Sequence, residues 1–494
     1  MIQGTGSYVG KSLLATGLCR VLSRRGIRVA PFKSQNMALN SFVTPAGHEI
    51  GMAQAIQAEA AGIEPTVEMN PILLKPSSSG CQVVVLGKPI GNMNSEEYFA
   101  FRHEALRIVR EAYVRLCARY EVIIIEGAGS PAEINLKARD VANMATAELA
   151  DSPVILVTDI DRGGAFAWVV GTLALLDPDE RARVKGIVFN KFRGRLDSLA
   201  PGLRMIEERT GIRVVGVLPF DRELTVGQED GVWVQEHSGG VGEIVVVRLP
   251  HISNFTDFDP LRAEIGDRLS FAETPPTRLP RAVILPGTKN TIRDLRFLRQ
   301  SGWADYIRRA AAAGTTVVGI CGGFQMLGRT LADPHGVEAC AESVGERETG
   351  RTGEVIGLEV LPLSTVFLPT KATYQIEAES LLPLFRGGGL RGYEIHMGET
   401  TREGCPPAFR IRRSGSDTWL EDGAAAGSVW GTYIHGLFEN DAFRAAFLEH
   451  LGVQRTARIA REFKETQYDR LADSVAKNLD MGFVAELLGL RGLI

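Results

Sequence analysis

The sequence predicts two α/β domains, each built on a parallel β-sheet. Short apolar runs alternate with longer amphipathic stretches, which is the pattern of repeated strand–helix units. A glycine-rich loop of the phosphate-binding kind opens the first series, and a cysteine follows one apolar run of the second. Between the series, residues 227–243 are rich in glycine and acidic side chains, lack helical periodicity, and are expected to be a linker.

The 494 residues are enough for several domains. We expect a nucleotide-binding domain at 1–226, a second α/β domain at 244–440 and a C-terminal helical extension at 441–494. Apolar runs predict strands at 28–32, 122–125, 154–158, 186–190 and 213–218, then at 244–249, 282–285, 315–320, 355–361 and 428–434. Amphipathic stretches predict helices at 11–24 and 104–120.

Composition excludes several classes of protein. Hydrophobic residues make up 45% and charged residues 23%, as in globular proteins. A net charge of −4 gives no electrostatic reason to expect nucleic acid or an acidic membrane surface as a partner. The six cysteines are scattered without a C-x-x-C pair, which argues against a zinc site or disulfide framework. Such scattered cysteines fit a reducing cytosol, and no apolar stretch approaches the roughly 18 residues of a membrane helix, so we expect a cytoplasmic protein.

Residues 4–12, with the sequence GTGSYVGKS, have the form of a phosphate-binding loop. Backbone N–H groups and the following helix N-terminus hold phosphate oxygens, the lysine reaches the terminal phosphates, and the serine hydroxyl is a ligand of Mg²⁺. Threonine stands where the strict pattern has its first glycine, a variant that resembles dethiobiotin synthetase and its relatives. A chance glycine-rich turn is the alternative. The predicted ATP-binding residues are Thr5, Gly6, Gly10, Lys11 and Ser12.

Polar residues at predicted strand ends extend this site. Glu126 ends the run 122–125, where a carboxylate can hold Mg²⁺ directly or through water; a solvated strand end is the alternative. Asn190 ends another strand, and its amide is a candidate to bind the nucleotide base or to serve a turn. Asp159 and Asp161 have three possible roles, which are to bind Mg²⁺, to bind the acceptor or to cap a helix.

Cys321 lies where a buried strand is expected to turn into a helix, the position of an exposed nucleophile. Gly322 would donate its N–H to an oxyanion, and Gly287, at an earlier strand end, would be the second donor. The alternative is a buried, inert thiol. His435 also ends a strand and is the predicted base.

Two features leave the partner of this histidine open. Leu437 stands where many glutamine amidotransferases carry a glutamate that orients the histidine. Glu394 is a candidate to orient His435 instead, or to bind glutamine, and His396 is a rival base that otherwise has a core or surface role. A Cys/His pair frees ammonia from glutamine, and ATP activates a carboxylate. Together they predict ATP-driven, glutamine-dependent amide formation.

The chain resembles the cobyric acid synthase family nearly from end to end. The resemblance rests on PFKSQNMALN (31–40), AQAIQAEA (53–60), MNPILLKP (69–76), EGAGSPAEINL (126–136), DIDRGG (159–164), NKFRG (190–194) and the Cys321 and His435 motifs. The sequence departs from the family at Tyr8, where related loops usually carry an acidic residue, and at Arg195, where the family usually has aspartate.

The resemblance implies a substrate and a reaction. The substrate is the corrinoid adenosylcobyrinic acid a,c-diamide, amidated at its b, d, e and g carboxylates. Each amidation consumes one ATP and one glutamine through an acyl phosphate. Around the acceptor carboxylate or terminal phosphate we place candidates that are otherwise loop amides and caps, namely Gln35, Asn36, Asn40, Asn135 and Asp140.

Three rival functions stay open from the sequence. Cobyrinic acid a,c-diamide synthase performs the same chemistry on an earlier precursor. A partitioning-type P-loop ATPase would dimerise on ATP and would not need Cys321. A stand-alone cysteine hydrolase would make no use of the ATP site. The sequence does not indicate the oligomeric state.

Overall fold

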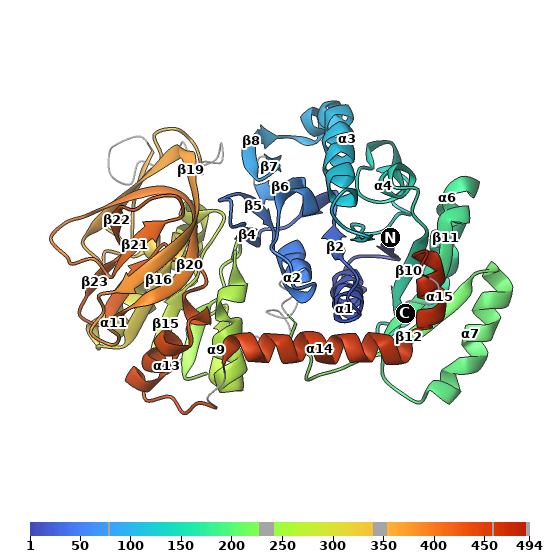
Figure 1. Ribbon diagram of the computed structural model, residues 1–494. Coiled ribbons are helices and arrows are strands. Elements are labelled where there is room, and N and C mark those ends of the chain that lie inside the picture. The colour runs from blue at the N-terminus through green and yellow to red at the C-terminus, as the bar shows by residue number, and fades with distance from the viewer. Residues whose placement is uncertain (78–79, 227–241, 339–352, 457–458, 491–494) are drawn as a thin grey trace.

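The computed structural model describes residues 1–77, 80–226, 242–338, 353–456 and 459–490. Its outline is elongated, with an N-terminal half and a strand-rich half side by side, and helix α14 (Ala460–Asn478) runs along both (Figure 1). Most of the expected linker, residues 227–241, lies outside the described residues.

The N-terminal half is built on parallel strands, as predicted. One sheet has the order β1 (Ile2–Gly4), β10 (Val154–Asp159), β11 (Val184–Phe192) and β12 (Arg213–Pro219). Strands β2 (Val29–Phe32) and β9 (Val122–Ile125) pair in parallel, and a parallel bridge between Ile2 and Glu126 joins this pair to β1. Its helices are α1 (Lys11–Arg24), α2 (Met52–Ala60), α3 (Ser95–Cys117), α4 (Met144–Leu149), α5 (Ala165–Leu175), α6 (Pro178–Arg183) and α7 (Leu196–Thr210).

A second, unpredicted layer of strands lies on the side of this half that faces the strand-rich half (Figure 1). It contains the sheet β3 (Gln35–Met37), β6 (Ile72–Ser77), β7 (Gly80–Val85) and β8 (Lys88–Met93), together with a hairpin of β4 (Ser41–Val43) and β5 (Glu49–Gly51). The sheet is antiparallel except where β3 pairs with β6.

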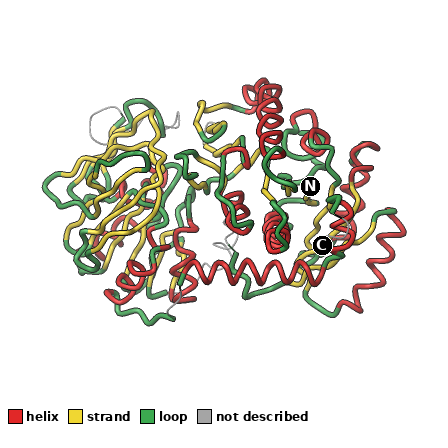
Figure 2. The backbone as a smooth tube through the Cα atoms, in the orientation of Figure 1, coloured by secondary structure: helices red, strands yellow, loops and turns green. Residues whose placement is uncertain are grey.

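The strand-rich half has one mostly parallel sheet and one mostly antiparallel sheet (Figure 2). The first has the order β14 (Leu269–Ala272), β13 (Ile244–Val247), β15 (Ala282–Leu285), β16 (Thr316–Ile320), β24 (Val429–Thr432) and β23 (Ala424–Ala426), with only β23 antiparallel. The second contains β18 (Glu354–Ile356), β17 (Thr330–Ala332), β19 (Leu363–Ser380), β20 (Gly387–Arg402), β21 (Phe409–Arg413) and β22 (Trp419–Asp422). The helices around them include α9 (Asp259–Ile265), α10 (Thr291–Gln300), α11 (Trp303–Ala312) and α12 (Gly322–Met326).

Two predicted elements differ most from the observed bounds. The helix expected at 104–120 begins at Ser95, because Asn94 and Glu97 form a reciprocal capping box. The strand expected at 355–361 ends at Ile356. Beyond Ile356 the backbone turns toward the end of α12, where Leu358 N donates a hydrogen bond to the Met326 carbonyl. The last carbonyls of a helix have no partner within it and need such donors.

The C-terminal helices α13 (Asp441–His450), α14 and α15 (Met481–Leu487) serve both halves. Phe443 and Phe447 of α13 are fully buried in the strand-rich half. Leu471 and Val475 of α14 instead belong to the core of the N-terminal half. The chain therefore returns across the molecule to complete the domain with which it began.

Two observations concern the chain as a whole. Within the described ranges, no helix combines the length and the apolar character that a membrane span requires. The five cysteines that the structure describes are all free thiols.

The contact between α1 and α14 gives a test of the fold. A Cβ atom on Gly17 would lie 2.6 Å from Val475 Cγ2, whereas Gly171 in α5 has open space around it. We expect Gly17→Leu to lower the free energy of unfolding by about 1–3 kcal/mol through overpacking. Gly171→Leu should not lower it, because leucine favours a helix over glycine. Thermal unfolding midpoints measure both, and equal midpoints would contradict this packing.

Candidate active sites

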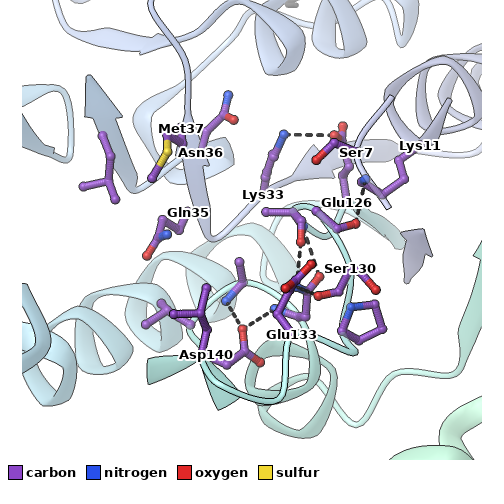
Figure 3. A pocket seen from close by; sticks show the side chains of 18 of the residues that line it. Ser7, Lys11, Lys33, Gln35, Asn36, Met37, Glu126, Ser130, Glu133 and Asp140 are labelled. Carbon is purple, nitrogen blue, oxygen red and sulfur yellow. Dashed lines mark hydrogen bonds and ion pairs between the residues drawn. The ribbon is translucent and has the colours of Figure 1, made fainter. Parts of the chain in front are cut away.

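A cavity of about 880 Å³ lies over the phosphate-binding loop. Gly10, in the left-handed conformation with φ 99°, caps α1, so Lys11 and Ser12 form the first turn of the helix below the cavity. Figure 3 shows Lys11 and Glu126 on one side of the cavity and Gln35, Asn36 and Met37 on the other. The predicted loop thus has the helix N-terminus that phosphate binding requires.

A buried charge network lies at the base of the cavity. Glu126 Oε1 accepts hydrogen bonds from Ser12 Oγ (2.8 Å) and Lys33 Nζ (2.9 Å), and its Oε2 accepts one from Gln57 Nε2 (2.6 Å). Burial acts to raise the pKa of Glu126, but Lys33 and these hydrogen bonds outweigh it and lower the pKa below its usual range. Glu126 is therefore a carboxylate held beside the loop, and Lys33 is a second cation that the sequence analysis did not assign.

Other predicted ATP-site residues form hydrogen bonds that hold the loop in place. Lys11 Nζ donates to the carbonyls of Gly6 and Gly129, both at 2.9 Å. Thr5 Oγ1 donates to Thr158 Oγ1 at 3.1 Å. Asn190 Nδ2 donates to the Val9 carbonyl at 2.9 Å, so its amide braces the loop.

The acceptor candidates separate into two groups. Gln35, Asn36 and Asp140 line the cavity. However, both carboxylate oxygens of Asp140 accept backbone N–H groups, from residues 142, 143 and 145, which is the capping role. Asn40 is buried and Asn135 is exposed, and both lie outside the cavity lining. Gln35 and Asn36 therefore stay as the better-placed candidates.

The two departures from the family differ in their relation to the site. Tyr8 lines the cavity with a left-handed backbone, φ 62°, and its carbonyl accepts a hydrogen bond from Lys191 Nζ. Arg195 is exposed before α7 and forms an ion pair with Asp197 at 3.5 Å.

Cys321 occupies the turn between β16 and α12, as predicted. Its backbone has φ 52° and ψ −111°, a region that side chains other than glycine rarely adopt. A Cβ on Gly323 would lie 2.0 Å from the Leu285 carbonyl, so only glycine permits the close approach of this turn to β15. The strained turn presents the thiol beside β20, where Sγ lies 3.6 Å from the Ile395 carbonyl.

His435 is oriented by Asp257, which the sequence analysis missed. His435 Nδ1 lies 2.7 Å from Asp257 Oδ2, and Cys321 is near enough to the ring to influence its pKa. Burial acts to lower the pKa of His435, but Asp257 and Cys321 outweigh it and raise the pKa well above its usual range. The three side chains thus have the relation of nucleophile, base and orienting carboxylate.

Glu394 does not orient His435, contrary to one of the possibilities left open. Its carboxylate contacts Arg413 Nε (2.7 Å) and His396 Nε2 (3.4 Å). His396 also contacts the Gly398 carbonyl through Nδ1 and stacks on Tyr433, with ring centroids 3.8 Å apart. These contacts favour a structural role for His396 over that of the catalytic base.

The predicted oxyanion donors lie close to the thiol and the base. Gly322 is the first residue of α12, where a backbone N–H has no partner within the helix. Gly287 lies beside the base, since a Cβ there would be 3.0 Å from His435 Cε1. Both stay predictions as oxyanion donors.

Two centres with different chemistry thus lie in one chain, a phosphate-binding loop and a Cys–His–Asp triad. Residues 1–232 match the family model described as the CobQ/CobB/MinD/ParA nucleotide binding domain. Residues 243–443 match the CobB/CobQ-like glutamine amidotransferase domain. The protein is therefore a glutamine amidotransferase joined to a nucleotide-binding domain that uses ATP.

The whole chain also resembles curated proteins. It is 48% identical to a cobyric acid synthase of Moorella thermoacetica, over 99% of this chain and 97% of that protein. It is 45% identical to a cobyric acid synthase of Syntrophobacter fumaroxidans (99% and 98%) and 48% identical to one of Desulforamulus reducens (99% and 98%). The chain belongs to the cobyric acid synthase family, whose members catalyse glutamine- and ATP-dependent amidation in cobalamin synthesis.

The triad gives a test of the glutaminase site. Asp257→Asn removes the charge that favours the imidazolium of His435, so we expect glutamine hydrolysis to slow about 10²-fold or more. Glu394→Gln, matched in chemistry and burial, should have a smaller effect because Glu394 contacts other groups. A larger loss in Glu394→Gln would contradict the assignment of Asp257.

The same pair predicts a pH dependence of stability. The pKa of His435 is raised to about 10, so its ion pair with Asp257 stabilises the fold fully below the unfolded pKa of about 6.5. This stabilisation is lost as the pH rises through the folded value. The difference in thermal midpoint between wild type and Asp257→Asn should be largest near pH 6 and smallest near pH 10.

Proposed function

We propose that the chain amidates the b, d, e and g carboxylates of adenosylcobyrinic acid a,c-diamide to give cobyric acid. Each amidation consumes one ATP and one glutamine. The observation that carries the proposal is the pairing, in one chain, of the Ser12–Glu126–Lys33 network under a large cavity with the Cys321–His435–Asp257 triad. The resemblance to cobyric acid synthases covers both halves, which favours this function over a partitioning-type ATPase or a stand-alone hydrolase.

The side chains that line the ATP cavity are complementary to a large acceptor that bears carboxylates. Met37, Phe99 and Leu136 line it, yet they are 56%, 43% and 49% exposed. Exposed apolar side chains around a cavity favour an apolar ligand such as a macrocycle. Arg102 and Arg139 lie in the same lining and would attract peripheral carboxylates.

In the glutaminase half, His435 takes the proton of Cys321, and the sulfur attacks the side-chain amide carbon of glutamine. Collapse of the tetrahedral intermediate forms a thioester and releases ammonia, which carries the proton returned by His435. Water then hydrolyses the thioester to glutamate and restores the thiol. Asp257 keeps the imidazole in the required orientation throughout.

In the N-terminal half, an acceptor carboxylate oxygen attacks the γ-phosphorus of ATP, giving an acyl phosphate and ADP. Ammonia attacks the acyl carbon, and phosphate leaves in place of the much poorer oxide leaving group. Lys11 and Lys33, whose amines lie at the phosphate-binding loop and beside Glu126, would stabilise charge on the transferred phosphoryl group. An ATP-consuming biosynthetic reaction of this kind fits the cytoplasm.

Mg²⁺ fits the residues present. Ser12 Oγ and Glu126 Oε1 lie 2.8 Å apart, and Mg²⁺ prefers a few such oxygen ligands together with phosphate oxygens and water. The ion would neutralise charge on the phosphates of ATP. In the ranges that the structure describes, no cluster of three or more His, Cys, Asp or Glu side chains offers an all-protein metal site.

Two variants separate the half-reactions. Cys321→Ala should abolish glutamine-dependent amidation and leave ammonium-dependent amidation, because only the source of ammonia is lost. Lys11→Ala should abolish both, because acyl phosphate formation needs the phosphate-binding lysine. Amide formed by Lys11→Ala would exclude the acyl phosphate route, and loss of both activities in Cys321→Ala would argue against separable centres.

The proposed substrate is tested by mass spectrometry of adenosylcobyrinic acid a,c-diamide incubated with the protein, ATP, Mg²⁺ and glutamine. We expect four successive amidations that are absent without ATP. Unchanged corrinoid alongside active glutamine hydrolysis would contradict this acceptor, and the cobyrinic acid a,c-diamide synthase reaction would be tested next.

A further inference from the structure

A cluster of buried charges joins the two halves between the thiol and the ATP cavity. Glu49, at the start of β5 and fully buried, accepts hydrogen bonds from Lys75 Nζ (2.7 Å) and Lys371 Nζ (2.5 Å). Lys75 lies on β6 of the N-terminal half, within the motif MNPILLKP, and Lys371 lies on β19 of the glutaminase half. Glu49 therefore links the two domains by an ion pair excluded from water.

The charges of this cluster depend on one another. Burial acts to raise the pKa of Glu49, but Lys371 and Lys75 outweigh it and lower the pKa far below its usual range. Burial and the neighbouring amines of Lys75 and Lys289 lower the pKa of Lys371 to about 7, although Glu49 opposes them. Removing the carboxylate would leave two buried amines without their counter-charge, which is strongly unfavourable.

The hairpin that carries Glu49 also contacts the glutaminase site. The Ser41 carbonyl on β4 accepts a hydrogen bond from Asn254 Nδ2 (2.9 Å), which also donates to the Tyr393 hydroxyl (2.8 Å). Tyr393 stacks on the base His435, with ring centroids 5.3 Å apart, and Phe42 of β4 packs against the same tyrosine ring. Tyr393 is thus the side chain that contacts both the hairpin and His435.

Contacts of the same elements connect the surroundings of the thiol with the lining of the ATP cavity. Cys321 Sγ contacts the carbonyl of Ile395 on β20, and Ile395 belongs to one buried apolar cluster with Tyr393 and with Val43 of β4. Lys75 Nζ donates to Ser41 Oγ on the hairpin (3.0 Å), and its neighbour Leu74 lines the ATP cavity. In Figure 1, β4 and β5 lie on the side of the N-terminal half that faces β19 and β20.

We propose that Glu49 is a positioning residue that couples the two reactions, because its ion pairs with Lys75 and Lys371 hold the β4–β5 hairpin against the glutaminase half. With the hairpin held there, ammonia released at Cys321 passes to the acyl phosphate rather than to solvent. Glu49 itself touches neither substrate. The proposal rests on the function proposed above.

The test is the ratio of glutamate released to amide formed, together with ammonium-dependent amidation. In wild type we expect a ratio near one. In Glu49→Gln, glutamine-dependent amidation should fall about tenfold or more, since one member of a buried charge cluster is lost. The ratio should rise by a similar factor, and ammonium-dependent amidation should stay within about twofold, because the ATP site is intact. Lys371→Gln alters the same ion pair from the other domain. It should likewise raise the ratio while leaving ammonium-dependent amidation nearly unchanged.

A matched control is Glu264→Gln. Glu264 is also buried, and two cations hold it, Arg444 Nε at 2.5 Å and Arg455 Nη1 at 2.6 Å, but all three residues lie in the glutaminase half and its C-terminal continuation. This variant should lose stability without a change in the ratio. Glu49→Asp keeps the charge and should give an intermediate ratio, which keeps the test available if Glu49→Gln folds poorly.

The outcomes are distinguishable. An unchanged ratio in Glu49→Gln and Lys371→Gln, or an equal rise in Glu264→Gln, would overturn the coupling role. Failure of the wild-type protein to amidate the corrinoid would instead contradict the proposed substrate.

Discussion

Both reactive centres depend on the geometry of a parallel strand that leads, through a loop or a tight turn, into a helix. Such a turn brings unpaired backbone N–H groups to the carboxyl edge of a buried sheet, where an anion or a developing oxyanion is stabilised. The constraint is visible in the backbone: Gly10 and Cys321, which cap the two helices, both have positive φ. Ser12 and Gly322 follow them in the first turns of α1 and α12. The same backbone geometry therefore occurs at the proposed phosphate site of one half and at the proposed acyl-transfer site of the other.

The relative position of the two halves is set by contacts from distant parts of the chain. Helix α14 follows the glutaminase half in sequence, yet it buries Leu471 and Val475 in the core of the N-terminal half. The β4–β5 hairpin reaches in the opposite direction, through Glu49 and Lys371. A protein that produces ammonia at one site and consumes it at another benefits from such reciprocal ties, because free ammonia is lost to solvent when the domains separate.

The functional residues that sequence analysis missed share a physical property. Asp257 lies in a short 3₁₀ helix far from His435 in sequence, and no local spacing marks it. Lys33 follows the predicted strand β2 and offered a signal, since a lysine at the carboxyl end of a parallel strand faces the phosphate site. Both roles come from contacts between segments that are not neighbours in the chain.

Local signals in the sequence determined the two parallel sheets, the phosphate loop, the cysteine turn and the histidine. Each depends on short-range rules, such as apolar periodicity or the glycine that a left-handed backbone needs. Only the tertiary structure decided the antiparallel layers, the capping role of Asp140 and the partner of His435. It also decided that the Glu394 carboxylate contacts Arg413 and His396, and that Glu49 forms an ion pair between the domains. Long-range partners are set by how the sheets pack, and local patterns in a single sequence do not reveal that packing.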